Sequence, residues 1–100
     1  MLTAISVDDQ KSFHKMLEEM VRADFSHRIA LVASATTVKE ALQAIQIYRP
    51  AIVFLDVELQ NETGFDLLEQ LPERNFEIIF TTAHDHYAIR AIRFHSALRP

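Results

Sequence analysis

The chain has 100 residues, a formal net charge of −4 and no cysteine, and 49% of its residues are hydrophobic. This composition indicates one small folded domain and excludes disulfide bonds and thiolate metal sites, which is consistent with a reducing cytoplasm. Because the basic residues are scattered, the longest aliphatic or aromatic run covers only residues 51–55, and the N-terminus lacks a signal-peptide pattern, we expect a cytoplasmic segment that binds neither nucleic acid nor membrane.

The first half of the chain alternates between two hydrophobic periods. Short apolar runs at 2–7 and 29–34 are typical of buried strands, whereas residues 10–25 and 37–48 have helical spacing. Pro50 is expected to end the second of these helices. The first helix has an apolar stripe at positions i, i+3, i+4, i+7 and i+8, formed by Phe13, Met16, Leu17, Met20 and Val21.

The second half repeats this alternation. Residues 51–56 form the most apolar predicted strand, and a short helix is predicted at 64–71 after a polar loop. A fourth strand is predicted at 76–82 and a fourth helix at 86–96. Apolar strands separated by helices predict an α/β fold with a doubly wound parallel sheet, covered on both faces, that binds ligands at the carboxyl ends of its strands.

Polar residues mark the starts of three predicted helices. Two pairs have the spacing of a capping box, Thr37 with Glu40 and Thr63 with Asp66. Asp85 is expected to cap the fourth helix.

Three predicted strands end in polar residues. The first is followed by Asp8 and Asp9, the third ends at Asp56, and the fourth ends at Thr81 and Thr82. If these strands are parallel neighbours, the side chains meet at one edge of the sheet, where three carboxylates repel and raise one another's pKa values. A hard divalent cation such as Mg²⁺ or Mn²⁺ relieves that repulsion. A neutralised aspartate beside a hydroxyl is suited to accept a phosphoryl group.

Four short motifs lie at these strand ends and in the loop after the third strand: "VDD" (7–9), "LDVEL" (55–59), "TG" (63–64) and "TTA" (81–83). In order and spacing they resemble the receiver domains of two-component response regulators. The sequence around the last three looks most like receivers joined to LytTR-type DNA-binding domains, and the resemblance covers residues 2–95. It implies a flavodoxin-like fold with strand order 2-1-3-4.

The resemblance also implies a role for each matching residue. Asp56 would be the phosphoacceptor, receiving the phosphoryl group from a sensor histidine kinase in a Mg²⁺-dependent reaction. Asp9 would bind the cation directly, Asp8 directly or through water, and the backbone carbonyl of Glu58 would be a further ligand. The chain would be a signalling switch rather than an enzyme, and it would regulate a LytTR-type output domain that lies outside this chain.

Further implied roles concern the end of the fourth strand and the C-terminus. The Thr82 hydroxyl and the Ala83 backbone would bind the phosphoryl group, and Thr82 would report phosphorylation to the fourth helix. The family continues with a fifth strand, a switch aromatic, a Lys-Pro pair and a fifth helix, whereas this chain reads "RFHSALRP". Arg99 is a candidate to replace the lysine, although an arginine is not its equivalent. We therefore expect a single receiver domain over residues 1–100 that is truncated at its C-terminus.

Two consequences are expected from these departures. Without a fifth strand, the fourth strand is an open edge, which we expect a homodimer to cover, by exchange of elements or through the fourth-helix side. The proline that is usual four residues after the phosphoacceptor is Gln60 here, so the loop after Asp56 is expected to be looser.

Other functions remain open at this point. The fold could serve as a phosphorylation-independent interaction module, which absent Mg²⁺ binding would favour. A Mg²⁺-dependent phosphohydrolase would use Asp56 as nucleophile and Glu58 as general acid, although so short a chain offers no obvious cap domain. Asp8 and Asp9 could simply cap the first helix, and Asp56 could be an ordinary strand-end residue.

Three residues are assigned ordinary structural roles. Gly64, the only glycine, is expected to provide flexibility at a helix start. His14 and His27 are expected to be surface residues.

Overall fold

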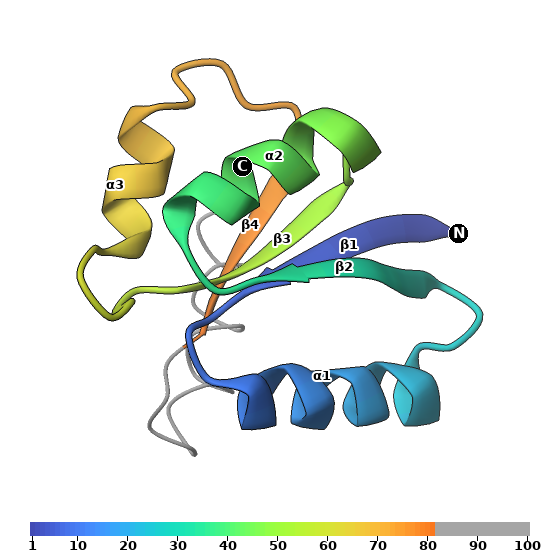
Figure 1. Ribbon diagram of the computed structural model, residues 1–100. Helices are drawn as coiled ribbons and strands as arrows, with labels where there is room; N and C mark the ends of the chain where they lie inside the picture. Colours follow the sequence, from blue (N-terminus) through green and yellow to red (C-terminus); the bar gives the residue numbers. More distant parts are fainter. Residues whose placement is uncertain (82–100) are drawn as a thin grey trace.

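Four parallel strands form the centre of the molecule. The computed structural model describes residues 1–81, and its strands are β1 (Leu2–Val7), β2 (Ile29–Ala35), β3 (Ile52–Asp56) and β4 (Glu77–Thr81). They pair in the order β2-β1-β3-β4, so the chain moves first to one side of β1 and then to the other (Figure 1). The predicted α/β class and strand order are confirmed.

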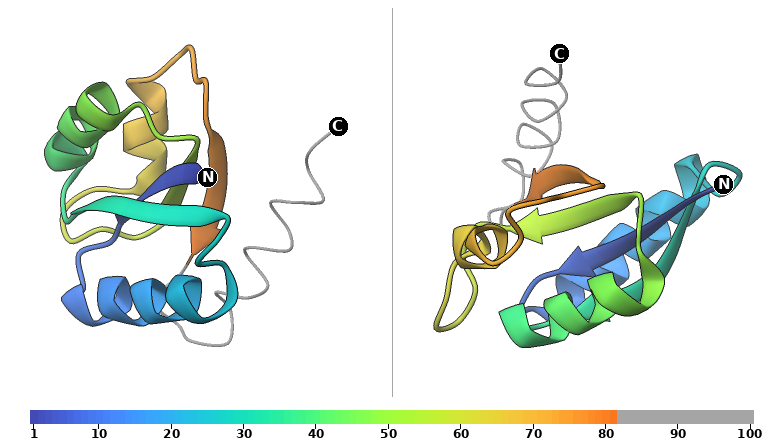
Figure 2. Two further views of the ribbon diagram at one scale, coloured as in Figure 1. Left: turned by 90° about the vertical axis from the view of Figure 1, so that its right-hand side faces the viewer. Right: turned by 90° about the horizontal axis from the view of Figure 1, so that it is seen from above.

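Helices cover both faces of this sheet. α1 (Lys11–Asp24) lies against one face, and α2 (Val38–Tyr48) and α3 (Gly64–Glu69) lie against the other (Figures 1 and 2). Right-handed crossovers on the two sides of β1 produce this division of the helices. The helix predicted at 86–96 lies outside the described residues. Within the described part of the chain, no helix has the length and apolar character needed to cross a membrane.

The apolar stripe of α1 is narrower than its sequence predicts. Phe13, Leu17 and Val21 are buried, and Met20 is partly buried in the same core. Met16 is 50% exposed, because it lies at the margin of the stripe rather than at its centre. The helix therefore attaches to the sheet through three well-buried side chains.

The predicted capping boxes form to different extents. Thr37 accepts the N–H of Glu40 at 3.1 Å, but the Glu40 carboxylate binds Thr36 rather than returning to Thr37. The box at α3 is complete, since Thr63 and Asp66 each accept the other's backbone N–H. Both helices thus start where the sequence predicts.

Each face of the sheet has its own apolar core. The core under α2 and α3 includes Ile5, Val7, Val53, Leu55 and Leu67. The core under α1 includes Ala4, Phe13, Leu17, Ile52 and Phe54.

On the face of the sheet that α1 covers, β3 and β4 end in polar side chains. Phe54 belongs to the α1 core and Ile79 packs against it, so the residues two positions further on, Asp56 and Thr81, point to the same face. These two residues are partners in the β3–β4 register. The α1 core therefore ends, at the carboxyl edge of the sheet, in a carboxylate beside a hydroxyl.

Candidate functional site

Three carboxylates meet at the carboxyl edge of the sheet. Asp8 and Asp9 follow β1, and Asp56 is the last residue of the neighbouring strand β3. One carboxylate oxygen from each lies within 4.8 Å of the other two. Asp8 and Asp56 are buried and Asp9 is partly buried. The predicted convergence of strand ends thus produces a compact acidic cluster with one side open to solvent.

Asp56 is the most perturbed carboxyl group of the cluster. It is 1% exposed, and among the described residues only one of its oxygens has a partner, since Oδ1 accepts the N–H of Glu58 at 3.2 Å. Burial, followed by the negative charge of Asp8, raises the pKa of Asp56 to about 7, although the bond from Glu58 opposes this shift. Near neutral pH the side chain therefore lies at the balance between its acid and its carboxylate.

Asp8 has a similar environment. Its Oδ1 accepts the N–H of Gln10 at 2.8 Å, and its Oδ2 is buried without a partner in the part of the chain that the structure describes. Burial raises the pKa of Asp8 as well, opposed mainly by the Gln10 bond and the nearby His14. Gln10, not an aspartate, occupies the N-cap position of α1 and makes no side-chain capping bond. The reading of Asp8 and Asp9 as simple helix caps is therefore wrong.

These features fit a hard divalent cation. Two buried carboxylate oxygens, on Asp8 and Asp56, have no hydrogen-bond partner within residues 1–81, and each lies beside other carboxylates of the cluster. Buried charges of one sign are costly unless a counter-charge compensates them. Carboxylate oxygens with room for water are the coordination that Mg²⁺ and Mn²⁺ take. Asp8, Asp9 and Asp56 would hold such an ion.

The backbone of Glu58 lies beside the acidic cluster. Its N–H donates to Asp56, while its side chain is exposed. Its exposed carboxylate makes no hydrogen bond with the described residues of the site, and the predicted role of the Glu58 carbonyl as a ligand stays a prediction. The residue forms an isolated antiparallel bridge with Thr63, which closes the loop after β3.

His14 was missed by the sequence reasoning, which placed it at the surface. The ring is partly buried and uses both nitrogens, Nε2 toward the carbonyl of Asp8 at 2.6 Å and Nδ1 toward the hydroxyl of Ser6. A carbonyl can only accept, so Nε2 donates to Asp8, and in the neutral ring Nδ1 accepts the hydroxyl proton of Ser6. In the sequence, His14 follows the "VDD" motif and lies near the start of the predicted helix, but only the fold brings its ring within reach of Ser6. His27 is exposed, as predicted.

Gly64 is required for a reason other than the predicted flexibility. Its φ is not positive, so no left-handed conformation demands glycine. A Cβ at this position would lie 2.5 Å from the carbonyl oxygen of Asp56 and 3.0 Å from a Leu55 side-chain carbon. The close approach of α3 to β3 therefore excludes a side chain here.

Only part of the predicted phosphoryl-binding set lies in the described region. Thr81 is fully buried, and its hydroxyl has no partner there. The sequence analysis assigned Thr81 no role beyond ending the strand. The residues assigned to phosphoryl binding and to replacement of the family lysine, Thr82, Ala83 and Arg99, lie outside the described residues, and their roles stay predictions.

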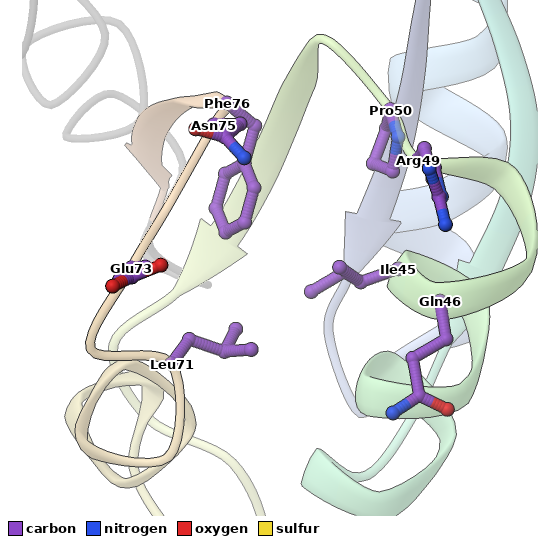
Figure 3. A pocket seen from close by; sticks show the side chains of 8 residues that line it. All are labelled: Ile45, Gln46, Arg49, Pro50, Leu71, Glu73, Asn75 and Phe76. Carbon is purple, nitrogen blue, oxygen red and sulfur yellow. The ribbon is translucent and has the colours of Figure 1, made fainter.

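Beside Asp9 there is a pocket of about 500 Å³, and a larger cavity lies at the opposite end of the sheet. It has a volume of about 650 Å³ and lies between the end of α2 and the segment that leads into β4 (Figure 3). Ile45, Leu71 and Phe76 form its apolar walls. The cavity has no cluster of acids and lies at the amino ends of β3 and β4, so it belongs to a different region from the carboxylates.

A family model and curated relatives match almost the whole chain. A family model described as "Response regulator receiver domain" matches residues 4–97. An uncharacterized response regulatory protein of Yersinia pestis is 40% identical over 97 residues, which cover 96% of this chain and 40% of that protein. The sensory transduction protein LytT of Enterococcus faecalis is 34% identical over 89 residues, which cover 87% of this chain and 36% of that protein. The chain thus spans well under half the length of these relatives.

Solved structures agree with this match. The REC domain of the PhyR response regulator of Erythrobacter litoralis superposes with a TM-score of 0.70 at 26% identity, covering 83% of this chain and 64% of that chain. The response regulator domain of Thermotoga maritima CheB gives a TM-score of 0.72 at 18% identity, covering 92% and 73% of the two chains. The second likeness, at so low an identity, shows the fold alone.

Proposed function

The chain belongs to the response regulator receiver domain family, and from that premise we propose that it is a phosphorylation-dependent signalling switch whose phosphoacceptor is Asp56. The observation that carries the proposal is the buried carboxylate of Asp56, which has one unpartnered oxygen and lies within 4.8 Å of two further acids. A sensor histidine kinase would be the phosphodonor.

The chemistry asked of Asp56 is a nucleophilic displacement at phosphorus. A carboxylate oxygen forms a bond to the phosphoryl group, the bond from phosphorus to the donor's histidine nitrogen breaks, and an acyl phosphate remains on Asp56. When bound, Mg²⁺ would supply positive charge that neutralises the carboxylates and the phosphoryl oxygens. Because the pKa of Asp56 is raised to about 7 by burial and Asp8, the metal-free protein would hold much of this group as the unreactive acid.

Neighbouring residues would hold the acceptor in place. The Glu58 N–H fixes Oδ1 of Asp56, and this leaves Oδ2 as the oxygen without a protein partner. Asp8 and Asp9 would hold the cation, with the Glu58 carbonyl as a further ligand. Thr82 and the Ala83 backbone would receive the phosphoryl oxygens, with Arg99 as the candidate replacement for the family lysine.

The signal would pass from this edge of the sheet to other parts of a longer protein. LytT of Enterococcus faecalis, which is named a sensory transduction protein, supports a role in signal transduction. We propose a cytoplasmic regulator in which Thr82 reports phosphorylation to the fourth helix, a homodimer forms through that side or by exchange of elements, and a LytTR-type DNA-binding domain gives the output.

The test is the intact mass of the chain after incubation with acetyl phosphate, with and without Mg²⁺. We expect the gain of one phosphoryl group that depends on Mg²⁺ and is lost in Asp56→Asn. Asp24→Asn is the matched control, because it removes an exposed carboxylate at the far end of α1. No gain in the folded wild-type chain would overturn the proposal and favour a phosphorylation-independent interaction module.

A further inference from the structure

One carboxylate ties the loop after the acceptor strand to another helix. Glu62 accepts the backbone N–H of Val38 through its side chain at 2.9 Å, although the two residues are 24 positions apart. Val38 is the first residue of α2, so its N–H has no acceptor within the helix. The carboxylate also lies at the positive end of the α2 dipole, which favours negative charge.

The same residue closes the loop through its backbone. The carbonyl of Glu62 accepts the N–H of Leu59 at 3.0 Å, and Gly64 donates to Val57 at 2.8 Å. Together with the bridge between Glu58 and Thr63, these bonds make the segment 57–63 a closed turn. Because these bonds join the residues of the turn to one another, an anchor at Glu62 would also position the other members of the turn.

The turn bears directly on the acidic cluster. Its first residues follow Asp56, and the N–H of Glu58 donates to the Asp56 carboxylate at 3.2 Å. Only Leu59, which is 7% exposed, fastens the turn to the core by burial, whereas Gln60 and Asn61 are exposed. Backbone bonds attach the start of the turn to the sheet and to α3, since Val57 donates to the carbonyl of Thr81 at 3.4 Å and accepts from Gly64, and the bond from the Val38 N–H to the Glu62 carboxylate attaches its other end to α2.

We infer that Glu62 is a positioning residue, which fixes the turn 57–63 on the amino end of α2 and so sets the affinity of the acidic cluster for Mg²⁺. The inference rests on the proposed function, because it takes the cluster to be a cation site. Glu62 need not touch the cation: it acts through the backbone of Glu58, which it holds against Asp56.

The structure provides a matched control for simple helix capping. Glu40 also places a carboxylate at the amino end of α2, where it accepts the N–H of Thr36 at 2.8 Å and its hydroxyl at 2.9 Å. Glu40 belongs to α2 itself, and its carboxylate bonds to Thr36, which is not part of the turn. Loss of Glu40 therefore reports the cost of removing a capping carboxylate, and loss of Glu62 adds the release of the turn.

The experiment compares the wild type with Glu62→Ala, Glu62→Gln and Glu40→Ala. Mg²⁺ affinity is measured by isothermal titration, and exchange of the Leu59 and Gly64 amide hydrogens is measured by NMR in the metal-free protein. In Glu62→Ala we expect Mg²⁺ affinity to fall about fivefold to tenfold and both amides to exchange about tenfold faster, as the loss of one charged hydrogen bond implies. Glu62→Gln should recover most of both losses, because its amide oxygen can still accept from Val38.

Glu40→Ala should lower the thermal midpoint comparably while leaving Mg²⁺ affinity and the two amides unchanged. If Glu62→Ala and Glu40→Ala behave alike in affinity and exchange, Glu62 is only a cap and the inference is overturned. If the wild-type chain binds no Mg²⁺, the proposed function fails together with the affinity part of the inference. Unchanged exchange in Glu62→Ala, with Mg²⁺ binding intact, overturns the inference alone.

Discussion

The two ends of the sheet differ in how their polar groups are satisfied. At the carboxyl end, three buried side-chain oxygens have no hydrogen-bond partner among the residues described: Oδ2 of Asp8, Oδ2 of Asp56 and Oγ1 of Thr81. At the amino end, the larger cavity has four polar lining residues, and all of them are exposed: Gln46, Arg49, Glu73 and Asn75. If cavity volume marked the functional region, that region would be the amino end. If buried polar groups without a partner marked it, it would be the carboxyl end.

The difference shows which property identifies a functional region in this molecule. Water can satisfy exposed polar groups, so the amino end is complete without a ligand. A buried carboxylate without a partner raises the free energy of the folded state until a proton or a cation binds. The carboxyl end is therefore the region where binding of a proton or a cation would lower the free energy of the folded state most, although the cavity at the amino end is larger than the pocket beside Asp9.

The largest expected effect is a pH dependence of stability that arises at the carboxyl end. Since the pKa of Asp56 is raised from 3.8 to about 7, the folded chain keeps a proton that the unfolded chain loses. The free energy of unfolding should therefore be highest near pH 4 and fall as the pH rises to 7, by at most about 4 kcal/mol from this group. Urea unfolding in the absence of divalent cations measures it.

Asp56→Asn is the control for this pH dependence. The variant cannot ionise at this position, so it should be more stable than the wild type at pH 8 and similar to it near pH 4. Mg²⁺ should stabilise the wild type at pH 8 more than it stabilises the variant. If the difference in the free energy of unfolding between wild type and variant is the same at both pH values, burial of the Asp56 charge does not cause the pH dependence.

The next largest effect concerns the packing of α3 against β3. In Gly64→Ala the new Cβ would lie 2.5 Å from the carbonyl oxygen of Asp56, and a backbone atom in the centre of the sheet cannot move freely. We expect the free energy of unfolding to fall by about 2–3 kcal/mol. At the amino end, the exposed Gln46→Ala should change it by less than about 0.5 kcal/mol. Equal effects would remove this difference between the two ends.

Much of the fold and the acidic cluster followed from local sequence. The hydrophobic period predicted each described strand and helix to within two residues at either end. The convergence of Asp8, Asp9 and Asp56 followed from the rule that neighbouring parallel strands have their carboxyl ends at the same edge of the sheet. These inferences succeed because each depends on a repeating local pattern and on one general rule of topology.

The interactions that support the cluster could not be predicted in this way. His14 joins Ser6 to Asp8, and Glu62 reaches Val38 across 24 residues. Such bonds depend on the distance between elements, which no period in the sequence specifies. The role of Gly64 was misjudged for the same reason, because its Cβ would collide with a strand rather than with its own helix.

A smaller effect of opposite sign is expected at Thr81. Its hydroxyl is buried without a partner in the described region, and valine has nearly the same shape. Thr81→Val should raise the metal-free free energy of unfolding by about 1 kcal/mol, because it removes an unsatisfied polar group. Thr81→Ser keeps the hydroxyl and should not be stabilising. A loss of stability in Thr81→Val would mean that the hydroxyl has a hydrogen-bond partner. The carboxyl end would then have fewer unsatisfied buried polar groups than the three named above.

The smallest effect tests whether the two ends are independent. Arg49 ends α2 with φ 45° and ψ 60°, a left-handed conformation that disfavours residues with a Cβ and suits glycine at a helix end. Arg49→Gly should therefore raise the free energy of unfolding by about 0.5 kcal/mol, measured by urea unfolding at pH 5 and pH 8. Strain at this end is conformational and involves no buried charge, so the gain should be the same at both pH values. A gain that differs between them would show that Arg49 influences the ionisation of Asp56 across the length of the sheet, and the division of the molecule into a charged, incomplete end and a satisfied end would no longer hold.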